Sequence, residues 1–285
     1  MVAFDYHEPA SLTEAFALLD AHGQDAHVFA GGTALVLLMR LGLIAPAHVV
    51  SLRRIGDLRE IGILPTGGLE IGALVTHAEV ERSALVQRFF APLAQTFGRV
   101  ATVRVRNQAT VGGNIAHADP ASDPPPMLMA LDADVAIASR AGSRTLPVHA
   151  FFTGIFETAL APGEIVTAIR IPPPASGTRG TYVKFLPASQ DDFATVSVAA
   201  TLRTGTSGKV EHVRLALGSV GMTPLRARRA EDALLGRTLT AQAIADATAL
   251  VREEVNPLSD ARGTADYKRK MAVVWTRRAL EGLRA

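Results

Sequence analysis

The 285-residue chain contains no cysteine. This absence excludes disulfides, cysteine-ligated zinc, cysteine-bound iron–sulfur clusters and thiol nucleophiles. The length corresponds to two domains of ordinary size, at roughly 150 residues each. The composition is that of a globular protein, with 48% hydrophobic and 20% charged residues.

Long hydrophobic runs are also missing. The longest, residues 34–47, has 14 residues and contains Arg40, whereas a bilayer-spanning helix needs about 20 apolar residues. The N-terminal sequence MVAFDYHEPASL has neither the basic nor the apolar segment of a secretory signal. We therefore expect no membrane span and a soluble, cytoplasmic protein.

The chain has little net charge, +2, which is too small to create a field for binding nucleic acid. The distribution is uneven, because residues 203–285 carry 15 basic and 9 acidic side chains, net +6, while residues 1–202 carry 14 and 18, net −4. A basic C-terminal third is typical of a partner-binding surface, and solvated helix faces explain it equally well. Arg277 and Arg278 are candidates for such a surface.

Motifs for metal binding and hydrolysis are absent. The eight histidines form no HxH or HExxH spacing, and His7, His22, His27 and His48 are scattered. No serine stands in a G-x-S-x-G context. Arg104 and Arg106 alternate on a segment that we expect to be extended; without interleaved aromatic residues they favour acidic partners over single-stranded nucleic acid. We therefore predict no metal site and no catalytic residue.

The predicted elements are short and mixed in the first half of the chain. A capping box at Ser11–Glu14 begins a helix that ends at Gly23. A short buried strand is expected at 28–30, and helices at 34–41, 92–99 and 127–131. Further strands are expected at 49–52, 69–73 and 134–139.

A linker at Pro172-Pro173-Pro174, followed by Gly177 and Gly180, marks a domain boundary. Beyond it we expect strands at 195–203 and 210–217 and helices at 227–235, 241–255 and 266–283. Strands followed by helices predict an α+β domain. One side of the last helix is expected to carry Tyr267, Met271, Val274, Trp275 and Leu283.

Two glycine pairs are the strongest candidates for binding chemistry. Gly31-Gly32 follows a predicted strand, and Gly112-Gly113 follows Thr110 and Val111. Such turns expose backbone N–H groups to an anion such as a phosphate or pyrophosphate, although many double glycines only turn the chain. Asp123 lies in a loop stiffened by proline and is either an acceptor for ribose or ribityl hydroxyls or a simple helix cap.

The combination of these runs resembles one family, the FAD-binding medium subunit of the molybdenum hydroxylases, of the carbon monoxide dehydrogenase and xanthine dehydrogenase type. The resemblance covers nearly the whole chain. It rests on Ala30-Gly31-Gly32-Thr33, residues 105–120, Asp123, and the runs at 158–160, 163–165, 171–172, 182–185, 192–196 and 216–220.

The resemblance implies an α+β fold. Residues 1–175 would form an FAD-binding domain of the vanillyl-alcohol-oxidase (PCMH) type, with subdomains at about 1–56 and 57–175. Residues 180–285 would form a C-terminal domain of the carbon monoxide dehydrogenase flavoprotein type.

The resemblance also implies the residues that bind non-covalent FAD. The two glycine runs would hold the pyrophosphate, Asp123 the ribityl or ribose side, and Val166 the adenine or flavin through its backbone. Lys184 would lie close to the isoalloxazine ring. The full set is Ala30, Gly31, Gly32, Thr33, Ala34, Val100, Thr110, Val111, Gly112, Gly113, Asn114, Asp123, Val166, Lys184 and Phe193.

The chain departs from the family pattern at two positions. Ala34 stands where many members carry a serine, so a hydroxyl contact is missing, and Phe193 stands where some carry tyrosine. One branch inserts a cysteine-bound iron–sulfur cluster into this subunit. The absence of cysteine excludes that arrangement here.

The function implied by the resemblance is electron transfer. A large molybdopterin subunit would oxidise the substrate, and a small subunit with two [2Fe–2S] clusters would pass electrons to the FAD of this chain for an external acceptor. A dimer of heterotrimers is the implied assembly. Two alternatives remain: a free-standing FAD-dependent oxidoreductase of the same fold, and a partner-binding protein that has lost the flavin.

Overall fold

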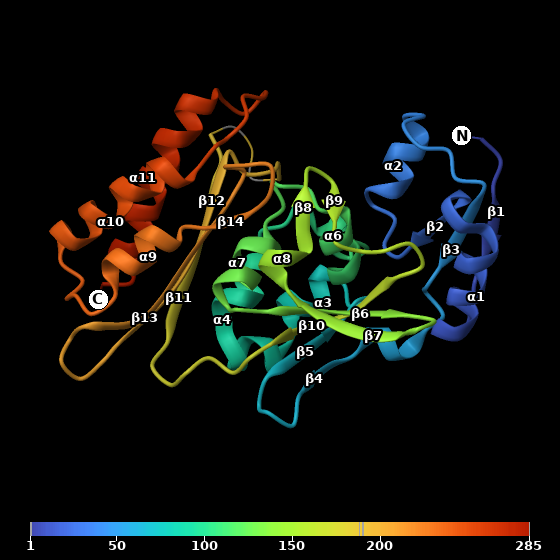
Figure 1. Cartoon of the computed structure of the whole chain (residues 1–285), viewed down its shortest axis with the longest axis horizontal. Coiled ribbons are helices and arrows are strands. Elements are labelled where there is room, and N and C mark those ends of the chain that lie inside the picture. The colour runs from blue at the N-terminus through green and yellow to red at the C-terminus, as the bar shows by residue number, and fades with distance from the viewer. Residues whose placement is uncertain (1, 188, 190, 285) are drawn as a thin grey trace.

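The computed structural model describes residues 2–187, 189 and 191–284, which form three units in sequence order (Figure 1). Each unit is built on one sheet and has its own hydrophobic cluster. Among these residues, no helix is both long and apolar enough to cross a membrane.

The first unit is a parallel sheet in the order β1-β3-β2, formed by β1 (Asp5–His7), β2 (Ala26–Phe29) and β3 (His48–Ser51). Helix α1 (Leu12–His22) packs on it. The Ser11 hydroxyl caps this helix by accepting from the Glu14 N–H at 3.2 Å. The remaining elements are η1 (Gly23–Asp25), α2 (Leu35–Arg40) and η2 (Gly56–Arg59).

Strand β2 corrects one expectation, because it is not buried. Val28 is 37% exposed and its side chain faces a cavity. The strand lies at the edge of a three-stranded sheet, so only one neighbouring strand, β3, pairs with it.

The second unit is an antiparallel sheet in the order β4-β5-β10-β6-β7. Its strands are β4 (Ile61–Ile63), β5 (Leu69–Gly72), β6 (Asp134–Ser139), β7 (Gly142–Pro147) and β10 (Ile165–Ile171). Its helices are α3 (His77–Arg82), α4 (Ala84–Gly98), α5 (Val103–Arg106), α6 (Val111–His117), α7 (Pro124–Ala130) and α8 (Val148–Phe151). The short pair β8 (Phe152–Gly154) and β9 (Glu157–Thr158) completes the unit.

The segment with Arg104 and Arg106 is helical as α5, not extended as expected. The Thr102 hydroxyl caps the helix by accepting from the Val105 N–H at 3.4 Å. Arg106 pairs with the Glu81 carboxylate at 3.0 Å, in keeping with the acidic partner that the sequence favoured. Its guanidinium also donates to the carbonyls of Val100 and Ala101, so it holds the turn that precedes α5 in place.

The third unit is the antiparallel sheet β11 (Arg179–Phe185), β12 (Val196–Thr204), β13 (Val210–Gly218) and β14 (Leu225–Arg226). Helices α9 (Arg228–Leu234), α10 (Ala241–Glu254) and α11 (Ala265–Gly282) cover one face (Figure 1). Helix α7 of the second unit lies against the other face, where the Thr201 hydroxyl donates to the Ala130 carbonyl at 2.9 Å. Because both faces are covered, β12 is buried along nearly its whole length.

The buried side of α11 agrees with the expected one only in part, because Leu283 at its C-terminal end is buried as expected and other expected residues are not. Ala272, Thr276 and Ala279 are buried, whereas Tyr267 is 38% exposed. Small side chains at this spacing let the helix lie close to β12. Met271 and Trp275 are only partly buried at the border of this contact, and Trp275 stacks on Phe185 with ring centroids 5.0 Å apart.

Candidate functional site

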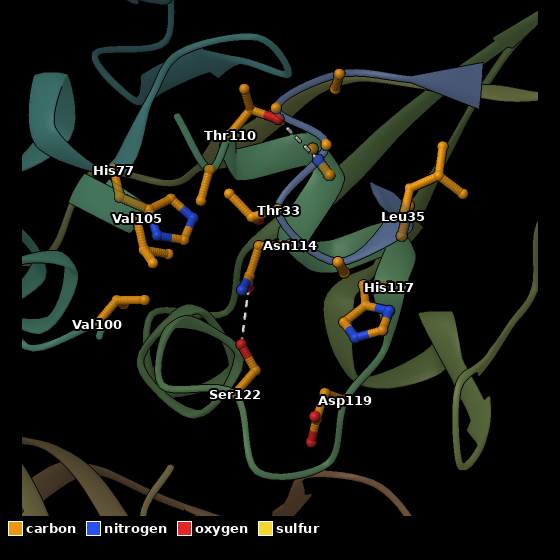
Figure 2. A pocket seen from close by; sticks show the side chains of 18 of the residues that line it. Thr33, Leu35, His77, Val100, Val105, Thr110, Asn114, His117, Asp119 and Ser122 are labelled. Carbon is orange, nitrogen blue, oxygen red and sulfur yellow. Dashed lines mark hydrogen bonds between the residues drawn. The ribbon is translucent and has the colours of Figure 1, made fainter. Parts of the chain in front are cut away.

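A cavity of about 640 Å³ is lined by residues of all three units. Its volume lies within the roughly 300–1,000 Å³ of small-molecule sites. The loop after β2 and the first turns of α3 and α6 contribute Thr33, His77 and Asn114, which are labelled in Figure 2. The bulged strand β10 and strand β11 also contribute. Most of the lining is apolar, as is typical of sites that bind small organic molecules.

Fourteen of the fifteen residues predicted for the site line this cavity. They are Ala30, Gly31, Gly32, Thr33, Ala34, Val100, Thr110, Gly112, Gly113, Asn114, Asp123, Val166, Lys184 and Phe193. Val111 is the exception: it is 1% exposed and packs in the hydrophobic cluster of the second unit. The structure thus brings together residues as far apart in the sequence as Ala30 and Phe193, and their individual roles in binding stay predictions.

The first glycine run needs glycine for two different reasons. A Cβ at Gly31 would lie 2.0 Å from the carbonyl oxygen of Gln108, so the two backbones touch. Gly32 has φ +70°, a left-handed conformation that side chains disfavour. A Cβ at Gly113 would lie 3.7 Å from Ala30, so the two glycine runs meet at one end of the cavity.

The two runs differ in the backbone donors they leave available. In the second run, Val111 and Gly112 donate to the carbonyls of Val75 and Ala73, and Gly113 donates to the Thr110 hydroxyl (Figure 2). In the first run, the N–H groups of residues 31–34 have no hydrogen-bond partner among the described residues. The donors that can hold an anion are therefore concentrated at 31–34, next to the Thr33 hydroxyl.

Asp123 is the carboxylate that the sequence predicts for the site. It is almost fully buried, at 2% exposure. Its carboxylate accepts from the Tyr182 hydroxyl at 2.5 Å and from the Lys184 ammonium at 2.8 Å. Tyr182 and Lys184 are two positions apart on β11 and therefore project from the same face. The alternative, in which Asp123 serves only as a helix cap, is not supported, because its side chain makes no hydrogen bond to the N-terminus of α7.

Burial sets the protonation behaviour of this cluster. It raises the pKa of Asp123, and the neighbouring Lys184 ammonium opposes the shift. Burial and the adjacent carboxylate raise the pKa of Tyr182 well above its usual value, so its hydroxyl stays protonated as a donor. Lys184 also donates to the Arg99 carbonyl at 2.9 Å, which uses two of its three N–H groups.

The sequence assigned no role to His77, yet this fully buried side chain also lines the cavity. Burial lowers the pKa of His77 to about 4. Among the described residues, neither ring nitrogen has a hydrogen-bond partner, so a neutral imidazole faces the site (Figure 2). One signal in the sequence could have indicated His77. It is the capping box Thr76–Glu79, which starts α3 beside the second glycine run.

Two further polar groups of the cavity escaped the sequence analysis. The Ser122 hydroxyl donates to Asn114 Oδ1 at 2.9 Å, which orients the amide nitrogen of Asn114 away from Ser122 (Figure 2). His117 stacks beside Phe156, and burial lowers its pKa against the opposing charge of Asp119. Nothing in its spacing singled out Ser122, whereas His117 lies in the run at 105–120 that carries the family resemblance.

Two family profiles match the chain and together cover almost all of it. The family described as "FAD binding domain in molybdopterin dehydrogenase" matches residues 2–174. The family described as "CO dehydrogenase flavoprotein C-terminal domain" matches residues 181–283.

The chain is also similar over its whole length to known proteins. It is 38% identical to the carbon monoxide dehydrogenase medium chain of Afipia carboxidovorans, across 99% of this chain and 97% of that protein. A solved carbon monoxide dehydrogenase of Hydrogenophaga pseudoflava superposes with a TM-score of 0.95 at 38% identity, covering 99% and 98% of the two chains. The solved quinoline 2-oxidoreductase of Pseudomonas putida 86 superposes with a TM-score of 0.92 at 34% identity. The match covers 100% of this chain and 99% of that chain.

Proposed function

Because this chain belongs to the family of FAD-binding medium subunits of the molybdenum hydroxylases, we propose that it is the electron-transfer subunit of such an oxidoreductase. The FAD would take electrons from [2Fe–2S] clusters on a small subunit and pass them to an external acceptor. The observation that carries this proposal is the cavity in which fourteen of the predicted residues meet. The proposed division into residues 1–175 and 180–285 agrees with family matches that end at 174 and begin at 181.

The residues of the cavity fit FAD. The unpartnered N–H groups at 31–34 and the Thr33 hydroxyl are suited to the pyrophosphate, since backbone donors favour an anion. Ala34 offers no side-chain hydroxyl, but among the described residues its backbone N–H has no other partner and stays available to the pyrophosphate. Asp123 and the backbone of Val166 would contact the ribityl or ribose and ring portions, as the family resemblance implies.

FAD, when bound, accepts electrons singly and delivers them in pairs. The protein's own contribution is charge and exclusion of water. The Lys184 ammonium is 3% exposed and has one N–H group beyond those that bind Asp123 and Arg99, so its positive charge acts in a poorly solvated site. Such a cation stabilises negative charge that develops on a neighbouring ring.

Substrate oxidation is assigned to a partner. The relatives carry names as different as carbon monoxide dehydrogenase and quinoline 2-oxidoreductase, yet each matches this chain along its full length. A common subunit alongside different substrates is expected if a large molybdopterin subunit selects the substrate. We propose a dimer of heterotrimers with this chain as the medium subunit.

The first test is the visible spectrum of the purified chain, alone and co-expressed with large and small subunits encoded beside it, followed by the mass of the released cofactor. We expect flavin bands, release of FAD on denaturation without protease, and added iron–sulfur absorbance in the co-expressed complex. A complex without flavin would overturn the proposal. A yellow chain that forms no complex would favour the free-standing flavin oxidoreductase.

A second prediction concerns assembly. Arg277 and Arg278 are exposed on α11 in the basic C-terminal third. Exposed ion pairs contribute up to about 1 kcal/mol each, so reversing both residues to glutamate is expected to weaken association with a partner roughly tenfold or more. The measurement is the subunit ratio after co-purification. Reversing the equally exposed Arg82 and Arg88 is the control, and unchanged recovery of partners with the Arg277/Arg278 variant would contradict the docking role.

A further inference from the structure

Three histidines that are scattered in the sequence meet in the first unit. His7 ends β1, His22 ends α1 and His48 begins β3. One ring nitrogen of each lies within 4.8 Å of the other two. The closest pair is His7 Nε2 and His48 Nδ1 at 3.2 Å, and the rings of His22 and His48 stack with centroids 3.6 Å apart.

Strand register and helix packing explain this meeting. In the parallel pair β1 and β3, Asp5 lies opposite His48 and His7 lies opposite Val50. Because side chains alternate along a strand, His48 and Val50 face the same side, and His7 joins them there. Helix α1 covers this side, with Phe16 and Leu19 packed against Val50, so its last residue, His22, reaches the two strand histidines.

The geometry suits a metal ion with nitrogen ligands. Zinc binds imidazole nitrogen at about 2.0–2.1 Å, which in a tetrahedral site places ligand nitrogens roughly 3.3 Å apart. The His7–His48 distance of 3.2 Å already matches this spacing. The Asp5 carboxylate lies 3.6 Å from His48 Nδ1 and adds negative charge beside the group. All three histidines are only partly buried, so an ion and a water ligand can reach them.

We propose that His7, His22 and His48 form a binding site for a divalent transition metal ion, zinc being the best fit, with Asp5 or water as the fourth ligand. None of the three histidines lines the large cavity. The cavity uses the chain that follows the end of β2, whereas His48 stands where the central strand β3 begins, at the opposite end of the parallel strands. The metal would therefore fasten β1, α1 and β3 together and take no part in redox chemistry, for which zinc has no second oxidation state.

The experiment uses the full chain without a histidine tag. Zinc is added, loosely bound ion is removed by gel filtration, and the retained metal is measured per chain; cobalt is then added to the metal-free chain as a spectroscopic probe of tetrahedral nitrogen coordination. The test variants are His22→Gln and His48→Gln. The matched control is His27→Gln, because His27 stands on β2 of the same sheet but opposite Val49, on the other face.

We expect one zinc per chain in the unchanged protein and in the His27→Gln variant. In the test variants, affinity is expected to fall by more than the roughly 10–100-fold that loss of an outer-shell partner costs. Zinc at about a hundredfold excess over its dissociation constant should raise the Tm of the unchanged protein and of the His27→Gln variant by about 5 °C. The Tm of the His22→Gln and His48→Gln variants should not change.

Two results would overturn the proposal. One is an unchanged protein that retains no zinc, gives no tetrahedral cobalt spectrum and shows no shift in Tm. The other is retention that survives both the His22→Gln and His48→Gln changes, which would place the metal elsewhere. Flavin content checks that each variant is folded, because the histidines lie outside the cavity.

Discussion

Replacing Lys184 with methionine is expected to lower the free energy of unfolding by about 3–5 kcal/mol, the cost of removing one partner from a buried ion pair. The Lys184 and Asp123 side chains are each 3% exposed, and their charged atoms are 2.8 Å apart. Asp123 directly precedes α7 of the second unit and Lys184 lies on β11 of the third, so the pair also joins the two units.

Chemical denaturation followed by fluorescence measures this effect. Trp275, the only tryptophan, stacks on Phe185, which follows Lys184 in the sequence. Its fluorescence therefore reports on the third unit. The control is Arg170→Met, which removes the exposed pair with Glu70 and is expected to cost at most about 1 kcal/mol. A Lys184→Met variant no less stable than this control would show that the buried pair is not stabilising.

The effect should depend on pH in a defined direction. Burial raises the pKa of Asp123, so the folded state binds a proton that the unfolded state releases, and stability falls as pH rises from the ordinary aspartate value through the raised one. Without the Lys184 ammonium, which opposes the shift, the pKa rises further and the fall extends to higher pH. The loss caused by Lys184→Met is therefore expected to be larger at pH 7 than at pH 4. Adding Asp123→Asn should recover part of the loss at pH 7 and remove this dependence.

Replacing Gly31 with alanine is expected to lower the affinity for FAD by roughly a hundredfold or more. The added Cβ would stand 2.0 Å from the Gln108 carbonyl oxygen, so the loop must move away from the second glycine run. Two lost hydrogen bonds to a charged group, at about 1.5–3 kcal/mol each, account for this change in affinity. The measurement is titration of the flavin-free chain with FAD, followed by quenching of flavin fluorescence.

Gly56→Ala is the matched control for this change. A Cβ at Gly56 meets nothing within 4 Å, so affinity and stability should stay close to those of the unchanged chain. Thermal unfolding of both variants separates misfolding from loss of the site. If Gly31→Ala binds FAD as tightly as Gly56→Ala, the first glycine run does not hold the cofactor.

Much of the site was predictable because its signals are local. The double glycines, the hydroxyl at Thr110 and the proline-flanked Asp123 each mark a turn or a helix start over a few residues. The helix start at Ser11 was predictable for the same reason, since a capping hydroxyl bonds only three residues ahead. Family resemblance then linked the separate runs to one cofactor.

The errors arose where a distant contact decided the outcome. α11 turns Ala272 and Thr276 toward β12, against an apolar pattern that favoured Tyr267 and Trp275. The arginine segment at 103–106 forms a helix whose Arg106 pairs with the distant Glu81, although its alternation resembled a strand. In both cases packing and pairing outweighed a weak local preference.

By itself, the sequence determined the absence of thiol chemistry, the glycine turns, the helix starts and membership of the flavin-binding family. Only the tertiary structure decided that Asp123 meets Tyr182 and Lys184 across 59 and 61 positions, that His77 faces the cavity and that His7, His22 and His48 converge. The reason is physical: a turn or a cap is specified by interactions over three or four residues, whereas these groupings depend on strand register and on which faces of the three units pack together.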